Sequence, residues 1–246
     1  MEKESRQPFG NGRLFLGLSF MKFSFSPSEL VKNFGGSYAR ELGIDLSGSD
    51  SAEIAKWFLA AILFGARIPG KTAAKTYAEF ERAGLVSSEK ILNAGWNELV
   101  RLLGRGGYKR YDFKTADKLL EVSHRLLQEY ASDLNGLHRM AADQLDLDYR
   151  IKQLGKGIGD ITTNIFLREM RGIWPKAQPL PSEKTVKAAK ALGFIDIYLC
   201  DGMSILKVLK DVAREDGIQP ADFPEFEAAL VRYETASRKK AMRKRP

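Results

Sequence analysis

Two glycines, Gly157 and Gly159, mark the stretch of this sequence whose residue types and spacing could do chemistry. They lie within residues 151–167, IKQLGKGIGDITTNIFL, between two apolar runs of helical character. Glycine permits positive φ and the close approach of another backbone, which predicts a tight turn between two short helices. The amides of Ile158, Gly159 and Asp160 would then point outward at a helix start and bind an anion such as a nucleic-acid phosphate. The alternative is a turn that only joins two helices.

Composition limits the other kinds of site. Cys200 is the one cysteine in 246 residues, which excludes an intrachain disulfide framework and a cysteine-ligated zinc or iron–sulfur site. A reducing compartment fits this usage. His124 and His138 fall on expected amphipathic helices, where a structural role is predicted. With 44% apolar and 28% charged residues, the composition is typical of a globular protein with a substantial core.

The formal net charge of +8 is concentrated at the C-terminus. The last nine residues carry six positive charges, on Arg238, Lys239, Lys240, Arg243, Lys244 and Arg245. Such a tail attracts nucleic acid non-specifically and in a salt-dependent way. The alternative is a solvated, disordered terminus.

The elements that would position these residues are almost all helices, because apolar residues recur at helical spacing from residue 51 onward. We expect helices over residues 27–34, 51–66, 69–83, 87–92, 96–103, 113–130, 137–145, 182–192, 202–216 and 221–236. Residues 14–25 are apolar and predict a strand or a buried extended segment, too short to span a bilayer and without a signal-peptide cleavage site.

The sequence therefore predicts a mostly-α fold. Its expected parts are a central helical domain of residues 50–168, a second helical subdomain of residues 14–49 and 169–236, and a basic tail of residues 237–246.

Four motifs in this order resemble the helix-hairpin-helix DNA glycosylase superfamily (HhH-GPD), which contains endonuclease III. Residues 156–164, KGIGDITTN, match the family's hairpin L-P-G-V-G-x-K-T-A-N. Residues 62–67, ILFGAR, resemble L-L-S-A-Q at the end of the first core helix, and residues 106–110, GGYKR, resemble the G-L-Y-N-S-K-A turn. Residues 179–193 resemble the segment that carries V-D-x-H. The resemblance covers residues 50–195 and implies two helical subdomains with a cleft between them.

The resemblance also implies how the chain would bind DNA. The hairpin residues Lys156, Gly157, Ile158, Gly159 and Thr162 would hold one backbone phosphate. A second set of candidate DNA-binding residues lies on two loops. Arg67 would fill the gap left by an everted nucleotide, and Lys109 and Arg110 would contact phosphates. For Arg67, Lys109 and Arg110 the alternative is an ordinary solvated basic residue.

The family's catalytic residues are not matched. The aspartate that members place beside the developing oxocarbenium ion falls on Pro181, and the lysine nucleophile of bifunctional members falls on Ile161. Asp160 and Glu183 are the remaining catalytic candidates, although helix N-terminal stabilisation explains each of them without catalysis. The expected cofactor is none: no iron–sulfur cluster and no metal site, with a monovalent cation at the hairpin left open.

Three hypotheses follow for the function. The first is a base-excision-repair protein that binds double-stranded DNA, flips a damaged base and excises it as a DNA N-glycosylase. The second is a non-catalytic DNA-binding helix-hairpin-helix module, and the third is a helical protein with a chance G-x-G turn. We expect a monomer without a membrane partner, located in the cytoplasm with the nucleoid, or in the nucleus of a eukaryote.

Overall fold

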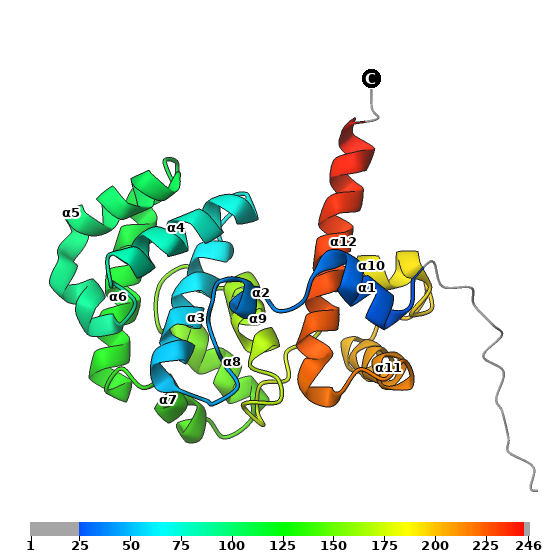
Figure 1. The fold of residues 1–246 in the computed structure, drawn as a ribbon. Helices are drawn as coiled ribbons and strands as arrows, with labels where there is room; N and C mark the ends of the chain where they lie inside the picture. The colour runs from blue at the N-terminus through cyan, green and yellow to red at the C-terminus, as the bar shows by residue number, and fades with distance from the viewer. Residues whose placement is uncertain (1–24, 244–246) are drawn as a thin grey trace, which may run out of the picture.

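The protein folds into helices alone over the residues that the structure, a computed structural model, describes, namely 25–243 (Figure 1). The predicted mostly-α fold is confirmed for this part of the chain. The extended segment expected at residues 14–25 lies outside the described residues, apart from Phe25. None of the described helices combines the length and the apolar character needed to cross a membrane.

The first of two hydrophobic cores surrounds α3 (Ser51–Phe64), which is buried on nearly every side. Asp50 caps this helix: its carboxylate accepts from the amides of Ala52 and Glu53. Trp57 is fully buried and donates a hydrogen bond from Nε1 to the carbonyl of Phe166 at 3.1 Å. The helices around α3 are α2 (Tyr38–Glu41), α4 (Gly70–Arg82), α5 (Ser88–Gly106), α6 (Asp112–Tyr130), α7 (Leu134–Met140), α8 (Gln144–Gln153) and α9 (Asp160–Glu169).

The second core brings the two ends of the described chain together (Figure 1). Its first helix begins with a reciprocal cap, in which Ser26 Oγ accepts from the amide of Glu29 and the Glu29 carboxylate accepts from the amide of Ser26. That helix packs along the last one. The helices of this core are α1 (Pro27–Phe34), α10 (Glu183–Leu192), α11 (Gly202–Glu215) and α12 (Phe223–Arg243), with the short 3₁₀ helix η1 (Pro220–Asp222) before α12.

Buried charged side chains connect the two cores. Glu169, at the end of α9, accepts from Ser37 Oγ at 2.6 Å and so holds the start of α2. Arg171 Nε lies 2.6 Å from Glu227 Oε2 on α12, and Arg171 Nη2 donates to the carbonyl of Pro179. These bonds fix the path of the chain where it passes from the first core to the second.

The first core extends beyond the expected central domain. It includes residues before position 50 and after position 168, which are Ala39, Ile44, Leu46, Met170, Trp174 and Ala177. The division of the chain at residues 50 and 168 stays a prediction.

Two expected helix boundaries were wrong. Instead of one helix over residues 137–145, the chain leaves the helical conformation at Ala141 (φ −63°, ψ 135°), and Asp143 caps the separate helix α8. The physical reason is that an aspartate accepting the amide of Asp146 starts a new helix more readily than it continues an old one. At the other end, α12 continues to Arg243 rather than stopping at residue 236.

Candidate nucleic-acid interface

The predicted hairpin is formed by the residues between α8 and α9. Gly157 has a φ of +86°, and the amide of Ile158 donates to the carbonyl of Gly155 at 3.0 Å. Ile158 is 5% exposed, so its amide and side chain both face inward, which corrects the expectation that this amide points outward. Gly159 then has extended backbone (φ −116°, ψ −172°), and α9 begins at Asp160.

The free amides lie one residue later than expected. Within residues 25–243, the amides of Gly159, Asp160 and Ile161 donate no hydrogen bond, and no side chain caps α9. These groups carry the positive end of the helix dipole. The hairpin therefore keeps an anion-binding capacity, now at the first turn of α9.

The three glycines of the hairpin have three different reasons to be glycine. A Cβ at Gly155 would lie 2.6 Å from Val122 Cγ2, so packing against α6 excludes a side chain there. Gly157 needs its positive φ. At Gly159 neither reason applies, because φ is ordinary and a Cβ would meet nothing within 4 Å. The fold does not require Gly159, and the bare backbone there is open to a ligand.

The end of α3 packs closely against the start of α9. A Cβ at Gly65 would lie 2.1 Å from Thr162 Oγ1, and Thr162 is buried. Thr162 was expected to contact DNA, but its side chain instead packs between the two helices, so only its backbone can serve a ligand. Arg67 is exposed and follows Gly65 by two residues, so the close approach of Gly65 to Thr162 brings this part of the chain near the start of α9.

The basic loop that carries Lys109 and Arg110 is held at the same end of α3. The Tyr108 hydroxyl donates to the carbonyl of Leu63 at 2.6 Å, and a Cβ at Gly107 would lie 3.4 Å from Thr72 near the start of α4. Lys109 and Arg110 are exposed, as is Lys156 on the hairpin. Arg110 lies over its neighbour's ring, 5.6 Å from the centroid of Tyr111. The structure thus brings the four predicted cations Arg67, Lys109, Arg110 and Lys156 to one end of the first core, and none of them forms an ion pair with another described residue.

Lys118 is a further cation that the sequence did not single out. Its Nζ and Cε would lie 3.3 Å and 3.0 Å from a Cβ at Gly157, so this side chain lies over the turn. Burial lowers its pKa, and within the described chain it has no hydrogen-bond or ion-pair partner. In sequence it is one of two lysines on an amphipathic helix, and only the packing of α6 on the hairpin distinguishes it.

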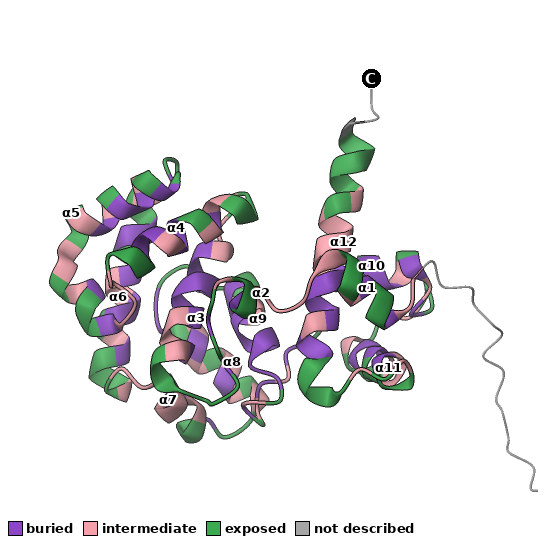
Figure 2. Ribbon diagram, viewed as in Figure 1, coloured by how far each residue is buried: buried purple, intermediate pink, exposed green. Residues whose placement is uncertain are grey.

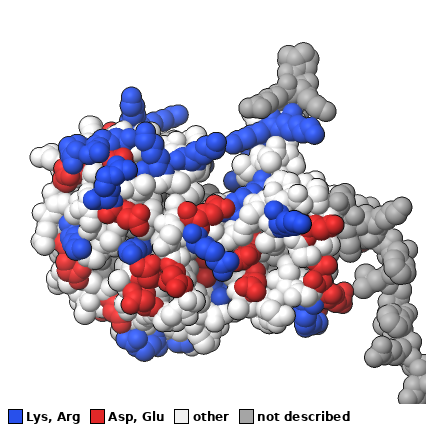
Figure 3. All heavy atoms as spheres, in the orientation of Figure 1, with Lys and Arg blue, Asp and Glu red and all other residues white. Residues whose placement is uncertain are grey.

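The helices that begin at this end of the molecule differ from the others, because no N-cap side chain accepts a hydrogen bond from their first turn. From α1 to α11, eight helices start with a Ser or Asp side chain that accepts an amide hydrogen bond. The three that start without such a cap are α4, α6 and α9. Their first turns surround the end of α3 and lie next to Arg67, Lys109 and Lys156. Uncapped amides and unpaired cations therefore coincide at α4 and α9, while at α6 the Asp112 carboxylate accepts from the amide of Phe113. Figure 3 shows lysine and arginine side chains along the upper edge of the molecule, with most acidic side chains below them.

The two positions of the family's catalytic residues lie near each other and are apolar. Ile161 is 64% exposed, and Asn164, one turn later on α9, donates from Nδ2 to the carbonyl of Leu180 at 2.7 Å. Leu180 is 46% exposed and precedes Pro181. Ile161 and Pro181 thus lie on the two sides of the contact between α9 and the segment leading to α10.

The two acidic candidates do not converge. Asp160 is 92% exposed and lies 2.5 Å from Lys152 Nζ, in an ion pair within the hairpin. Glu183 is exposed on the first turn of α10 and lies 2.5 Å from Lys187 Nζ. The hydrogen bond from Lys187 holds the pKa of the Glu183 carboxyl below its usual value, and Arg238 adds a weaker contribution. Both side chains are surface groups with a lysine partner.

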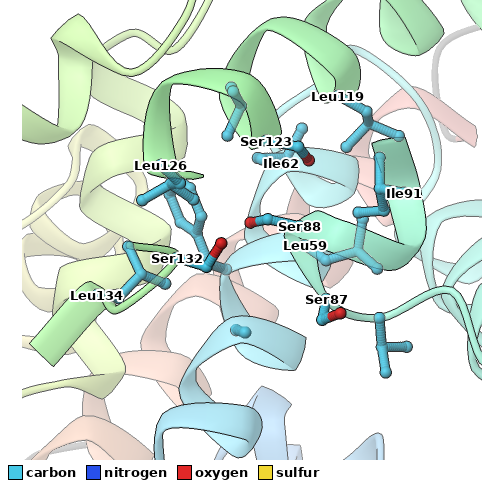
Figure 4. A pocket seen from close by; sticks show the side chains of 14 residues that line it. Leu59, Ile62, Ser87, Ser88, Ile91, Leu119, Ser123, Leu126, Ser132 and Leu134 are labelled. Carbon is cyan, nitrogen blue, oxygen red and sulfur yellow. The ribbon is translucent and has the colours of Figure 1, made fainter. Parts of the chain in front are cut away.

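Two cavities lie elsewhere. A pocket of about 20 Å³ lies between α3, α5 and α6 and is lined by apolar residues together with Ser87, Ser88, Ser123 and Ser132 (Figure 4). It has room for one water molecule and excludes a nucleobase. A groove of about 640 Å³ is lined by Ser37, Arg40, Glu169, Arg171 and Glu225 among others, at the opposite end of α9 from the hairpin.

The fold is similar to a known one. No family model matches the sequence, and no curated protein does either. Among solved structures, the crystal structure of the H. pylori 3-methyladenine DNA glycosylase MagIII bound to 1,N6-ethenoadenine matches with a TM-score of 0.51 and 13% sequence identity, over 88% of this chain and 99% of that one. The chain thus has the helical DNA glycosylase fold that the order of its motifs predicted.

Proposed function

We propose that this protein binds duplex DNA by holding a backbone phosphate at the first turn of α9. The observation that carries the proposal is Gly159, a glycine that neither backbone conformation nor packing explains. A side chain there would stand in front of the free amides of Gly159 and Asp160. Its absence leaves the amides accessible to a phosphate oxygen.

The surrounding cations support the same ligand. Lys156 and Lys118 flank the turn, while Arg67, Lys109 and Arg110 extend the positive surface along the end of α3. Phosphate contacts of this kind position a protein on a duplex without reading its sequence. In this proposal Arg67 occupies the gap left by an everted nucleotide, since it is exposed, unpaired among the described residues and next to the hairpin.

The fold supports a place in base-excision repair. The similar structure from H. pylori is a DNA glycosylase bound to a modified adenine. We extend to this chain the recognition of a damaged or modified base in duplex DNA, with base eversion as its mechanism.

Recognition without excision is the version that the geometry favours. Breaking a glycosidic bond develops positive charge on the sugar, which a nearby carboxylate stabilises. Ile161 and Pro181 supply neither a nucleophile nor a carboxylate, and Asp160 is directed to Lys152 at the surface. Apolar side chains at this place can pack against an everted nucleotide but cannot stabilise its cleavage.

Glu183 supports a second candidate function, excision with a relocated acid. It lies two residues after Pro181, and its lowered pKa keeps it in the ionised form that an oxocarbenium ion needs. Base release in single-turnover reactions, on duplexes carrying uracil, hypoxanthine, 8-oxoguanine, 1,N6-ethenoadenine or alkylated purines, tests this. Release that is lost in Glu183→Gln establishes the enzyme, and no release from any duplex that the protein binds leaves the binding function alone.

The proposed binding is tested with matched glycine variants. Gly159→Ala places a methyl group in the open space before the amides and should weaken duplex binding by about tenfold or more, or roughly 1.4 kcal/mol. Gly48→Ala is the control, because a Cβ there also meets nothing within 4 Å, and α3 separates it from the hairpin by about 20 Å. Equal DNA affinities for wild type and both folded variants would remove the hairpin from the proposal.

A further inference from the structure

The last part of α12 has no packing role in the described structure. The last residue of this helix that packs on the second core is Tyr233, and residues 238–242 are exposed (Figure 2). A helix rises 1.5 Å per residue, so α12 continues for roughly 15 Å past Tyr233. Figure 1 shows this end standing clear of both cores. We call residues 236–243 the arm.

The arm is basic, and its cations form no close ion pair within the described chain. Glu234 is the last acidic residue of the sequence, and every charged residue after it is Lys or Arg. Arg238, Lys239 and Lys240 form no ion pair within 4 Å to any residue of the described chain. Exposed lysines and arginines elsewhere are often paired, as in Arg101–Glu98 and Lys187–Glu183. Neither packing nor ion pairing in the described chain therefore explains the arm's charge.

The arm begins on the hairpin side of the second core. Arg238 is close enough to Glu183 to contribute to the lowered pKa of that carboxyl. Glu183 starts α10 just after Leu180, whose carbonyl accepts from Asn164 on α9. The start of the arm therefore lies near the first turn of α10, beside the contact between α9 and the segment that leads to α10. In Figure 3 its blue side chains continue the basic upper edge of the first core.

We propose that the arm is a second DNA-binding surface, which contacts the phosphate backbone of the duplex to one side of the hairpin contact. The inference rests on the proposed function, because it takes the same duplex as its ligand. The recognised chemistry is the phosphodiester backbone alone, since flexible lysines and arginines without an ordered polar framework read charge and not base identity. The arm attracts and orients the duplex, and the hairpin with Arg67 makes the contact at the everted nucleotide.

A charge-matched comparison tests the arm. The variant Lys239→Gln with Lys240→Gln removes two charges and keeps residues of good helix propensity. The control, Lys207→Gln with Lys90→Gln, removes two exposed lysines that form no ion pair within the described chain. Affinity for an undamaged duplex is measured over a range of salt concentrations. The slope of log affinity against log salt should fall in magnitude by about 1 to 2 in the arm variant, since each lost phosphate contact contributes about 0.9. The control should keep the wild-type slope.

The outcomes separate the arm from the hairpin. An arm variant with the wild-type slope, or with the same loss as the lysine control, overturns the arm proposal and leaves the hairpin proposal intact if Gly159→Ala still loses binding. Wild-type protein that does not bind duplex at all overturns the proposed function itself. Circular dichroism checks that the helical content of the two double variants equals that of the wild type.

Discussion

At the scale of single residues, the hairpin glycines differ in their role: the fold requires two of them, and the proposed binding requires the third. Gly155→Ala should destabilise the protein by about 1–3 kcal/mol, because its methyl group would overlap Val122. Gly157→Ala should cost about 1–2 kcal/mol, because alanine is disfavoured at a φ of +86°. Gly159→Ala should change stability by less than about 0.5 kcal/mol, as its φ is ordinary and the space is open. Urea unfolding measures all three, and a large stability loss in Gly159→Ala would contradict the distinction.

Lys118 should make the affinity for duplex DNA depend on pH. Burial lowers its pKa from the usual 10.5, so this lysine loses its charge at a lower pH than an exposed one. A bound phosphate favours the charged form, and therefore DNA affinity should fall as the pH rises toward 10.5 through the lowered pKa. Lys118→Arg keeps its charge throughout this range and should show a flatter profile. The measurement is duplex affinity against pH, and identical profiles for the two proteins would exclude Lys118 from the phosphate site.

The free energy of unfolding should also depend on pH through Lys118, but it should rise with pH where the DNA affinity falls. Because the pKa of Lys118 is lower in the folded state than in the unfolded state, the unfolded chain binds more protons between the two pKa values. The free energy of unfolding therefore rises with pH in that window. Wild type should gain stability relative to Lys118→Met as the pH increases toward 10.5, as urea unfolding at several pH values would show. A stability difference that stays constant with pH would mean that the lysine is solvated.

At the scale of elements, close glycine–threonine contacts set how helices meet at the interface. Gly65 meets Thr162 where α3 ends and α9 begins, and Gly106 meets Thr76 between α5 and α4. Gly65→Ala should cost about 1–3 kcal/mol through overpacking and should weaken DNA binding, since it displaces the hairpin from Arg67. Adding Thr162→Ala removes the nearest atom and should restore part of the stability. Urea unfolding of both single variants and the double variant measures this coupling, and strictly additive losses would contradict the close contact.

Helices with a clear apolar period could be predicted from the sequence even where no side chain caps them, as for α4 and α6, but short helices and breaks within an apolar run could not. The predicted helices at residues 27–34 and 182–192 match α1 and α10, where a serine cap precedes each helix. The break at Ala141 was missed because apolar residues continue at helical spacing across it, and α2 was missed because four residues show no period.

The candidate site was predictable to a similar degree. The hairpin motif and its neighbouring loops carry their own sequence signals, so Arg67, Lys109 and Arg110 could be named in advance. Lys118 and the inward packing of Thr162 depend on contacts between segments distant in sequence, and a motif contains no information about those contacts.

At the scale of the whole molecule, the buried pair Arg171–Glu227 fixes how the two cores meet. Both side chains are almost fully buried, and Arg171 also donates to the carbonyl of Pro179, just before Leu180 and Pro181. The pair therefore positions the segment that faces Ile161. Arg171→Met leaves Glu227 buried without its partner and should lower the free energy of unfolding by about 3–5 kcal/mol.

Replacing both partners should cost much less than replacing one. In Arg171→Met with Glu227→Leu no uncompensated charge remains buried, so most of the lost stability should return. Arg101→Met is the control, because its pair with Glu98 lies at the surface and contributes little to stability. Urea unfolding of the wild type, the two single variants and the double variant measures these differences. If Arg171→Met lowers the free energy of unfolding no more than Arg101→Met does, apolar packing alone joins the cores. If the pair does join them, duplex affinity should fall in Arg171→Met and recover incompletely in the double variant, because Pro179 still lacks its hydrogen bond.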